Sequence, residues 1–310
     1  MSPQFLLLLL AFGLLIAATA ATWLLTATGR ADVALMRNVV QRIRAWWVMV
    51  GVLGLALVLG DWALILLFAV LSGLALREVL AVTLRPDADR LAIMLAYAVI
   101  LPVQYLLILV DWYGLFAVFI PVYAFLLLPV IAALRASPDG FLDRVAGTQW
   151  GLMIAVFCLS HLPALVMLDF PGPAPDAALL VAWVIIVVQL SDVLQFVWGK
   201  VLGRRLIAPR LSPSKTWEGF LGGALCATLV GTALWWLTPF TPVWAAIMAG
   251  LLTLLGFLGG LVLSAVKRDR GVKDWGHLVP GHGGVTDRID SLVFSAPLFF
   301  HLTRWGWSLS

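Results

Sequence analysis

Residues 177–198 read AALLVAWVIIVVQLSDVLQFVW, an apolar run that contains one charged side chain, Asp192. A helix that crosses a bilayer needs about 20 predominantly apolar residues. The run is therefore long enough to span a membrane. Helix is favoured over strand because an isolated span must satisfy all of its backbone hydrogen-bonding groups internally.

The composition of the whole chain agrees with a membrane environment. Hydrophobic residues make up 63% of the 310 residues and charged residues 12%, whereas a soluble domain carries about 25% charged residues. The net charge of +4 is too small to favour a nucleic-acid partner. Cys158 and Cys226 both lie in apolar runs, which argues against a disulfide framework or a cysteine-based metal site.

The same length rule predicts about ten membrane helices along the chain. The candidates lie near 4–28, 45–60, 62–82, 91–110, 113–134, 148–168, 177–198, 219–237, 243–266 and 291–304. We therefore predict an all-α, polytopic integral membrane protein, with N-terminal transmembrane helices in residues 1–180 and a C-terminal transmembrane catalytic region in residues 181–310. The segment from Ser2 to Leu25 is expected to be an anchoring helix rather than a cleaved signal, because it lacks a basic leading region.

Lysine and arginine residues fall in every second loop. They are Arg30, Arg37, Arg42 and Arg44; Arg77, Arg85 and Arg90; Arg135 and Arg144; Lys200, Arg204, Arg205, Arg210 and Lys215; and those of the loop that starts at Lys267. Only Arg304 breaks the alternation. Because basic loops stay on the cytoplasmic side, we expect these loops in the cytoplasm and both termini on the other side. The membrane would be the cell inner membrane or another cytoplasmic membrane.

Two of the basic loops, residues 199–218 and 267–290, hold ten of the 20 lysine and arginine residues. Lysine and arginine bind phosphate oxygens, and the glycines of Pro280-Gly281-His282-Gly283-Gly284 let backbone N–H groups approach an anion. Asp287 and Asp290 are hard oxygen ligands, and Mg²⁺ is commonly held by one or two carboxylates together with substrate phosphates. Together these groups favour a metal-bridged polyphosphate ligand.

Each of these groups, taken alone, has a simpler interpretation. Basic loops also mark topology and contact anionic lipid, which could explain Arg204, Arg205 and Arg210. Gly283-Gly284 could be merely a turn, without a role in binding. Asp192 is harder to explain in this way, since an acidic residue near the end of a span is costly unless it is solvated or paired.

The order of residues in the second loop is specific. It reads Ser264-x-x-Lys267-Arg268-x4-Lys273-Asp274-x-Gly276, followed by His282-Gly283-Gly284-x-x-Asp287-Arg288-x-Asp290. This pattern closely resembles the signature of the phosphatidate cytidylyltransferases (CDP-diacylglycerol synthases). The first loop, with Ser212-Pro213-x-Lys215-Thr216-x-Glu218-Gly219, is also similar to that family. The resemblance covers roughly residues 190–300, and the first 180 residues match only as a series of membrane spans.

The resemblance implies an enzyme, a nucleotidyltransferase that converts phosphatidic acid and CTP into CDP-diacylglycerol and pyrophosphate with Mg²⁺ in phospholipid biosynthesis. The lipid phosphate would attack the α-phosphorus of CTP without a covalent enzyme intermediate, so catalysis would rest on positioning and charge neutralisation. The partners implied are CTP, phosphatidic acid and membrane lipid, with no nucleic acid. Assembly as a homodimer is left open.

The resemblance also implies roles for individual residues. The expected catalytic residues are Ser264, Lys267, Arg268, Lys273 and Asp287. The expected substrate-binding residues are Ser212, Lys215, Thr216, His282, Gly283, Gly284 and Arg288. The expected metal ligands are Asp287, Asp290, Asp274 and Asp192.

The chain departs from the family pattern just before the signature. The family usually has a Gly-Asp pair where this chain has Gly259-Gly260, and an acidic residue often found shortly before Ser264 is replaced by Leu263. Asp192 or Asp274 must then compensate, or metal binding is weakened. Two alternatives stay open: a catalytically weakened or non-enzymatic paralogue that binds lipid phosphate, and a cytidylyltransferase that acts on another lipid phosphate. A transporter would show paired, broken spans in its two halves, which the sequence does not suggest.

Overall fold

A computed structural model describes residues 3–27, 33–84, 90–135, 138–171, 176–278 and 283–308. Helices account for nearly all of these residues, and the described part of the chain contains one two-stranded antiparallel hairpin. The prediction of an all-α fold is confirmed.

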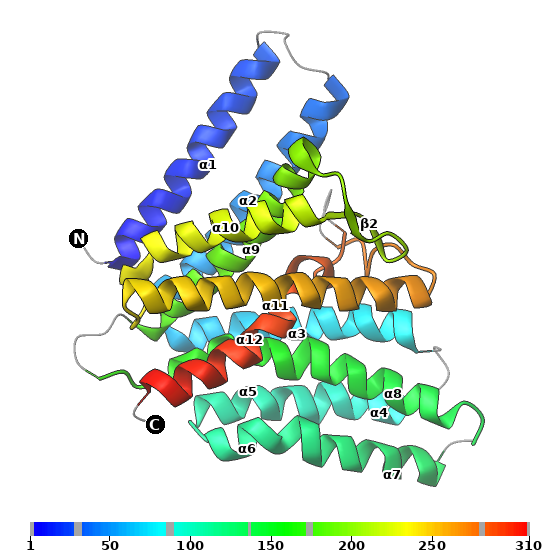
Figure 1. Ribbon diagram of the computed structural model, residues 1–310. Coiled ribbons are helices and arrows are strands. Elements are labelled where there is room, and N and C mark those ends of the chain that lie inside the picture. The colour runs from blue at the N-terminus through cyan, green and yellow to red at the C-terminus, as the bar shows by residue number, and fades with distance from the viewer. Residues whose placement is uncertain are drawn as a thin grey trace.

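The first half of the chain forms three long helices followed by several that change their winding (Figure 1). The long helices are α1 (Pro3–Ala27), α2 (Val33–Leu59) and α3 (Asp61–Thr83). The others are α4 (Arg90–Leu95), η1 (Ala96–Ile100), α5 (Leu101–Leu109), α6 (Tyr113–Val118), η2 (Phe119–Ala124), α7 (Phe125–Arg135), α8 (Phe141–Leu152), η3 (Met153–Cys158) and η4 (Pro163–Met167). The segments η1, η2 and η3 are π-helical, and η4 is a 3₁₀-helix.

The second half combines long helices with the hairpin. Its elements are α9 (Ala177–Leu202), β1 (Leu206–Ala208), β2 (Ser212–Thr216), α10 (Trp217–Ala233), η5 (Trp235–Leu237), α11 (Pro242–Asp269) and α12 (Thr286–Trp307). The strands pair with Leu206 opposite Thr216 and Ala208 opposite Ser212. The hairpin therefore connects the end of α9 directly to the beginning of α10.

Seven helical stretches in the described part of the chain are long and apolar enough to cross a membrane. They are Pro3–Leu24, Val39–Leu59, Asp61–Thr83, Arg90–Leu109, Tyr113–Leu134, Ala177–Leu202 and Pro242–Asp269. A polytopic membrane protein is confirmed, but the count of ten spans is not. The predicted span at 148–168 is divided among α8, η3 and η4, α10 has 17 residues, and α12 carries three charged residues in its first turns.

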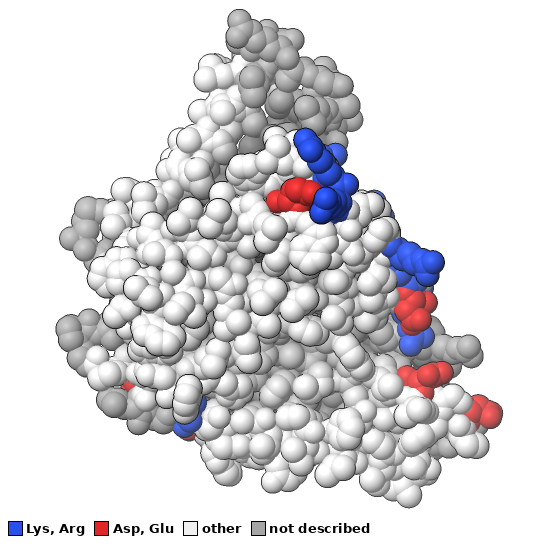
Figure 2. Space-filling model, viewed as in Figure 1, with Lys and Arg blue, Asp and Glu red and all other residues white. Residues whose placement is uncertain are grey.

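The outer surface is apolar over most of the face shown in Figure 2. Large side chains such as Leu14, Val58 and Leu126 are exposed. Most of the charged atoms visible in Figure 2 gather along its right edge, the end of the molecule where Figure 1 places β2, and both termini lie at the opposite side. An exposed apolar surface of this extent is typical of a protein that is surrounded by lipid.

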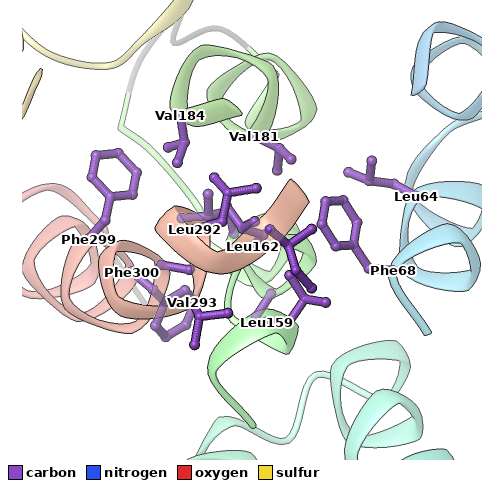
Figure 3. Packing of buried hydrophobic residues seen from close by; sticks show 14 of the residues in the cluster. Leu64, Phe68, Leu159, Leu162, Val181, Val184, Leu292, Val293, Phe299 and Phe300 are labelled. Carbon is purple, nitrogen blue, oxygen red and sulfur yellow. The ribbon is translucent and has the colours of Figure 1, made fainter. Parts of the chain in front are cut away.

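The buried core surrounds α12 (Figure 3). Apolar side chains from α3, α9, α12 and the segment before η4 point toward one another there. They include Leu64, Phe68, Leu159, Leu162, Val181, Val184, Leu292, Val293, Phe299 and Phe300. Both halves of the chain thus contribute to one cluster. Residue 180, the predicted boundary between two regions, lies within α9, and the division itself stays a prediction.

The helices α9 and α10 pack closely because glycines line their contact. A Cβ on Gly219 would lie 2.7 Å from the carbonyl oxygen of Gln195, and one on Gly222 would lie 2.8 Å from the ring of Trp198. Small residues allow membrane helices to approach this closely. Thr216, the last residue of β2, caps α10, since its Oγ1 accepts a hydrogen bond from Gly219 N–H at 3.1 Å. This packing holds β2 beside the end of α9.

Candidate functional site

A cavity of about 230 Å³ lies where β2 meets the helices α9, α10, α11 and α12. Seven residues predicted from the sequence line it: Asp192, Lys215, Thr216, Ser264, Asp287, Arg288 and Asp290. The structure therefore brings the loop of Lys215 and the signature segment to one place, although the two are far apart in the sequence. The lining also includes Phe257, Gly260 and Ser291.

Asp287 is buried, and both of its carboxylate oxygens accept hydrogen bonds. Lys267 Nζ donates to Oδ1 at 2.7 Å. The backbone N–H groups of Trp275 and Gly284 donate to Oδ2 at 2.8 and 3.0 Å. Gly283 has a φ of 83°, and a Cβ there would lie 2.9 Å from Oδ2, so glycine is required at this position for two reasons. The signature segment thus folds around the Asp287 carboxylate.

Glu78 of α3 contacts the beginning of α12. Its Oε1 accepts a hydrogen bond from Val285 N–H at 2.9 Å, and its Oε2 accepts one from Thr286 N–H at 2.8 Å. These N–H groups have no partner within the helix itself. Sequence reasoning did not identify Glu78. The available signal was an acidic residue inside a predicted span, which is costly unless it is paired or solvated.

Ser291 bridges the carboxylates of Asp192 and Asp290. Its Oγ donates to Asp192 Oδ2 at 2.6 Å and lies 3.4 Å from Asp290 Oδ1. The same Asp290 oxygen accepts the Ser291 N–H at 2.9 Å. Sequence reasoning missed Ser291 as well, and only its place beside Asp290 could have indicated it. The contact brings two acidic groups, one from α9 and one from α12, to the same wall of the cavity.

Lys215 reaches from β2 to the opposite wall. Its Nζ donates to the Phe257 carbonyl oxygen at 3.4 Å and lies 4.6 Å from the centre of the Phe257 ring, within cation–π distance. Burial lowers the pKa of Lys215; the charges of Asp192 and Asp290 oppose this shift, and that of Lys267 adds to it. An anionic ligand in the cavity would therefore stabilise the charged form of this lysine.

Gly260 lies between these groups, at the position where the family pattern has an aspartate. A Cβ on Gly260 would lie 3.1 Å from Lys215 Nζ, 3.7 Å from Ser291 Oγ and 4.0 Å from Asp290 Oδ2. Ser264, one turn later in α11, donates from Oγ to the Gly260 carbonyl oxygen at 2.7 Å. A side chain at position 260 would thus project among the polar groups of the cavity.

The remaining predicted residues that the structure describes are not part of the cavity lining. They are Ser212, Lys267, Arg268, Lys273, Asp274, Gly283 and Gly284. His282 lies outside the described residues. Lys267 and Gly284 donate hydrogen bonds to Asp287, whereas Arg268, Lys273 and Asp274 are exposed. Arg268 donates to two backbone carbonyl oxygens, at 3.4 and 3.1 Å, and so holds neighbouring loops together.

The arrangement of carboxylates bears on metal binding. Across the ranges that the structure describes, no three His, Cys, Asp or Glu side chains are grouped so that they could hold a metal ion. Asp192 and Asp290 line the cavity together, and Mg²⁺ is commonly held by one or two carboxylates plus substrate phosphates. This donor set fits an ion that is shared with a phosphate-bearing ligand better than one enclosed by protein alone.

The cavity also offers donors for an anion. Arg288 Nε is buried and makes no hydrogen bond within the described part of the chain. An arginine presents its N–H groups in a fork that matches phosphate oxygens, so a ligand phosphate could satisfy this buried donor. With Lys215 and Arg288 on its walls and two carboxylates nearby, the cavity is suited to a phosphate group and its divalent counter-ion.

Comparison with known proteins points to one family. The sequence model of the cytidylyltransferase family matches residues 40–305. The uncharacterized protein YnbB of Escherichia coli (strain K12) is 38% identical over 272 residues, which cover 86% of this chain and 88% of that protein. The phosphatidate cytidylyltransferases of Staphylococcus haemolyticus (strain JCSC1435) and Staphylococcus aureus (strain COL) are 34% and 36% identical over 154 residues. Those matches cover 48% of this chain and 59% of each staphylococcal protein.

Proposed function

The chain belongs to the cytidylyltransferase family, and we propose that it transfers the cytidylyl group of CTP to phosphatidic acid. The products would be CDP-diacylglycerol and pyrophosphate. The observation that carries the proposal is that Lys215, Arg288, Asp192 and Asp290 line one cavity beside Asp287. The likeness to the two staphylococcal phosphatidate cytidylyltransferases supports the choice of substrates.

The proposed reaction is a direct displacement. An oxygen of the phosphatidic acid phosphate attacks the α-phosphorus of CTP, the bond from that phosphorus to the oxygen that bridges it to the β-phosphate breaks, and pyrophosphate leaves. The lipid phosphate is itself the nucleophile, so no side chain has to form a covalent intermediate. Lys215 and Arg288 would bind phosphate oxygens and reduce the repulsion between the two anionic substrates, which makes positioning and electrostatics the main contributions of the protein.

Mg²⁺ is part of the proposal. Asp192 and Asp290 would hold the ion, and Asp287 lies on the same lining. When bound, the ion would supply positive charge to the triphosphate and the leaving pyrophosphate. Asp274 is the weakest of the proposed ligands, because it is exposed and does not line the cavity.

The proposed reaction takes place at the cytoplasmic face of the cell inner membrane or another cytoplasmic membrane. The cavity lies at the end of the molecule that carries β2 and the end of α11, and the positive-inside rule assigns their basic loops to the cytoplasm. CTP is supplied from that side, and phosphatidic acid is supplied from the bilayer at the same level. Both substrates can therefore reach the cavity.

Gly260 favours a second candidate function. Without a carboxylate at this position, the metal site of the proposed enzyme has one ligand fewer than the family pattern. A paralogue that binds lipid phosphate with weakened or no turnover, or one that uses another lipid phosphate, would accommodate this loss.

The choice between these functions can be tested with purified protein in mixed micelles. Pyrophosphate release from CTP is measured with Mg²⁺ and, in separate reactions, phosphatidic acid, a polyprenyl phosphate or no lipid phosphate. We expect release only with phosphatidic acid. Release only with the polyprenyl phosphate would replace the proposed acceptor, and binding of phosphatidic acid without release would favour the non-enzymatic candidate.

A further inference from the structure

We propose that Glu78, in the N-terminal half of the chain, is a positioning residue that holds Asp287 in place for the reaction. The inference rests on the proposed function, since it assigns Glu78 a role through Asp287. It extends the site to α3, which the signature does not include.

The contacts of Glu78 end one residue before Asp287. Its two oxygens accept the N–H groups of Val285 and Thr286, 207 and 208 residues away in the sequence. Val285 is the N-cap of α12 and supplies no side-chain hydrogen bond to the helix. Thr286 Oγ1 also donates to the Ala75 carbonyl oxygen of α3 at 3.4 Å. The position of the first turn of α12 is therefore fixed by α3.

Glycines on both sides of the signature loop make room for the Glu78 carboxylate. A Cβ on Gly276 would lie 2.6 Å from Glu78 Oε1, and a Cβ on Gly284 would collide with Oε2. The residues that hold Asp287 Oδ2 are Gly284 and Trp275, the neighbour of Gly276. The stretches at 275–276 and at Gly284 therefore lie against the carboxylates of both Glu78 and Asp287. A displacement of Glu78 would move this backbone and, with it, Asp287.

A purely structural role is the alternative. A carboxylate at the N-terminus of a helix stabilises that helix wherever it occurs. Asp176 also places a carboxylate at a helix N-terminus, since as the N-cap of α9 it accepts a hydrogen bond from Ala178 N–H at 3.0 Å, and it does not line the cavity. Asp176→Asn keeps an acceptor oxygen and removes the charge, and it is therefore the matched control for loss of a negative charge at a helix N-terminus.

The test compares Glu78→Gln with Asp176→Asn in the full-length protein. Glutamine keeps the size of the side chain but presents an NH₂ group to one of the two backbone N–H groups. We expect hydrogen exchange to become faster in the segment 283–287 of Glu78→Gln and nowhere else near the cavity. We also expect kcat to fall by about 10- to 100-fold with little change in the KM for CTP, because a misplaced catalytic group lowers turnover more than binding. Asp176→Asn should keep the kcat of the unmodified protein.

A second pair of variants tests the coupling. Gly276→Ala should lower kcat because its methyl group displaces the Glu78 carboxylate, and it should have little further effect when Glu78 is already alanine. Equal effects in both backgrounds would overturn the inference. So would unchanged exchange in Glu78→Gln, or faster exchange with unchanged kcat.

Failure of the proposed function gives a different result. In that case the unmodified protein makes no CDP-lipid, while the exchange measurement still reports whether Glu78 holds the segment 283–287.

Discussion

Lys267 Nζ lies 2.7 Å from Asp287 Oδ1, and both side chains are buried. Two backbone N–H groups hold the other oxygen of the carboxylate. An ion pair at this depth forms only when its geometry and hydrogen bonding compensate for the loss of water. The pair connects the end of α11 to the beginning of α12, and so fixes the two helices that form one side of the cavity.

Removing one partner of this pair should destabilise the protein. We expect Lys267→Met to lower the free energy of unfolding by about 3–5 kcal/mol, because it leaves Asp287 as a buried carboxylate without its cation. Thermal unfolding in detergent would measure the change. The double variant Lys267→Met with Asp287→Asn should recover much of the stability and remain inactive. A single variant as stable as the unmodified protein would contradict the role given to the pair.

Lys215 should contribute to substrate binding. In Lys215→Ala the cavity loses a cation that lies opposite two carboxylates, so we expect the KM for the lipid phosphate to rise by about tenfold or more. Steady-state kinetics in mixed micelles would measure this KM. Arg270→Ala is the control, because Arg270 is an exposed cation outside the cavity lining. An unaffected KM would exclude Lys215 as a phosphate ligand.

Gly260→Asp should restore the missing carboxylate. The nearest atom to the new Cβ is Lys215 Nζ, the end of a flexible side chain that can move aside. We therefore expect the Mg²⁺ concentration for half-maximal activity to fall. Gly260→Asn matches the size without the charge and should not lower it. If Gly260→Asp leaves the Mg²⁺ requirement unchanged, another carboxylate already serves as the ligand.

Glu218 should make the hairpin connection sensitive to pH. Its carboxylate accepts the N–H groups of Arg204 and Arg205 at 3.0 and 3.2 Å. These backbone hydrogen bonds, that of Arg204 first, lower the pKa of Glu218. The stabilisation of the folded state by these hydrogen bonds is thus complete above the ordinary glutamate pKa of about 4.3. It is lost as the pH falls through the lower pKa that Glu218 has in the folded protein.

Hydrogen exchange at Arg204 and Arg205 would test this dependence. After correction for intrinsic exchange rates, protection should persist at pH 5 and decrease at lower pH. Glu218→Gln should remove the decrease, since glutamine does not titrate. A protection profile that is the same in both proteins would contradict the assignment.

The sequence predicted the regular parts of the fold well. Apolar length located α9 and α11, because each is one continuous apolar helix. The two helices begin at the N-caps Asp176 and Thr241. The sequence did not predict how the stretch at 148–168 divides into α8, η3 and η4. Changes of helical winding depend on packing against other helices, and apolar length carries no information about them.

The site was predictable where its residues follow one another closely. The signature placed Lys267 and Asp287 in one motif, and the structure places them in contact. Glu78 contacts Val285 across 207 residues, and no local pattern reveals such a pair. A place in the motif also does not guarantee a place in the site. Lys273 and Asp274 belong to the motif but are exposed and do not line the cavity.

The fate of the α-phosphate of CTP shows whether the protein transfers a cytidylyl group to phosphatidic acid. Purified protein is incubated with Mg²⁺, phosphatidic acid and CTP labelled at the α-phosphate, and the lipid fraction is separated from the aqueous phase. We predict that the label enters the lipid fraction with one pyrophosphate released for each labelled lipid, and that Asp287→Ala, inserted normally in the membrane, transfers none. Label that stays in the aqueous phase with the unmodified protein would contradict the proposed transfer, and equal transfer by Asp287→Ala would contradict the role of Asp287 in it.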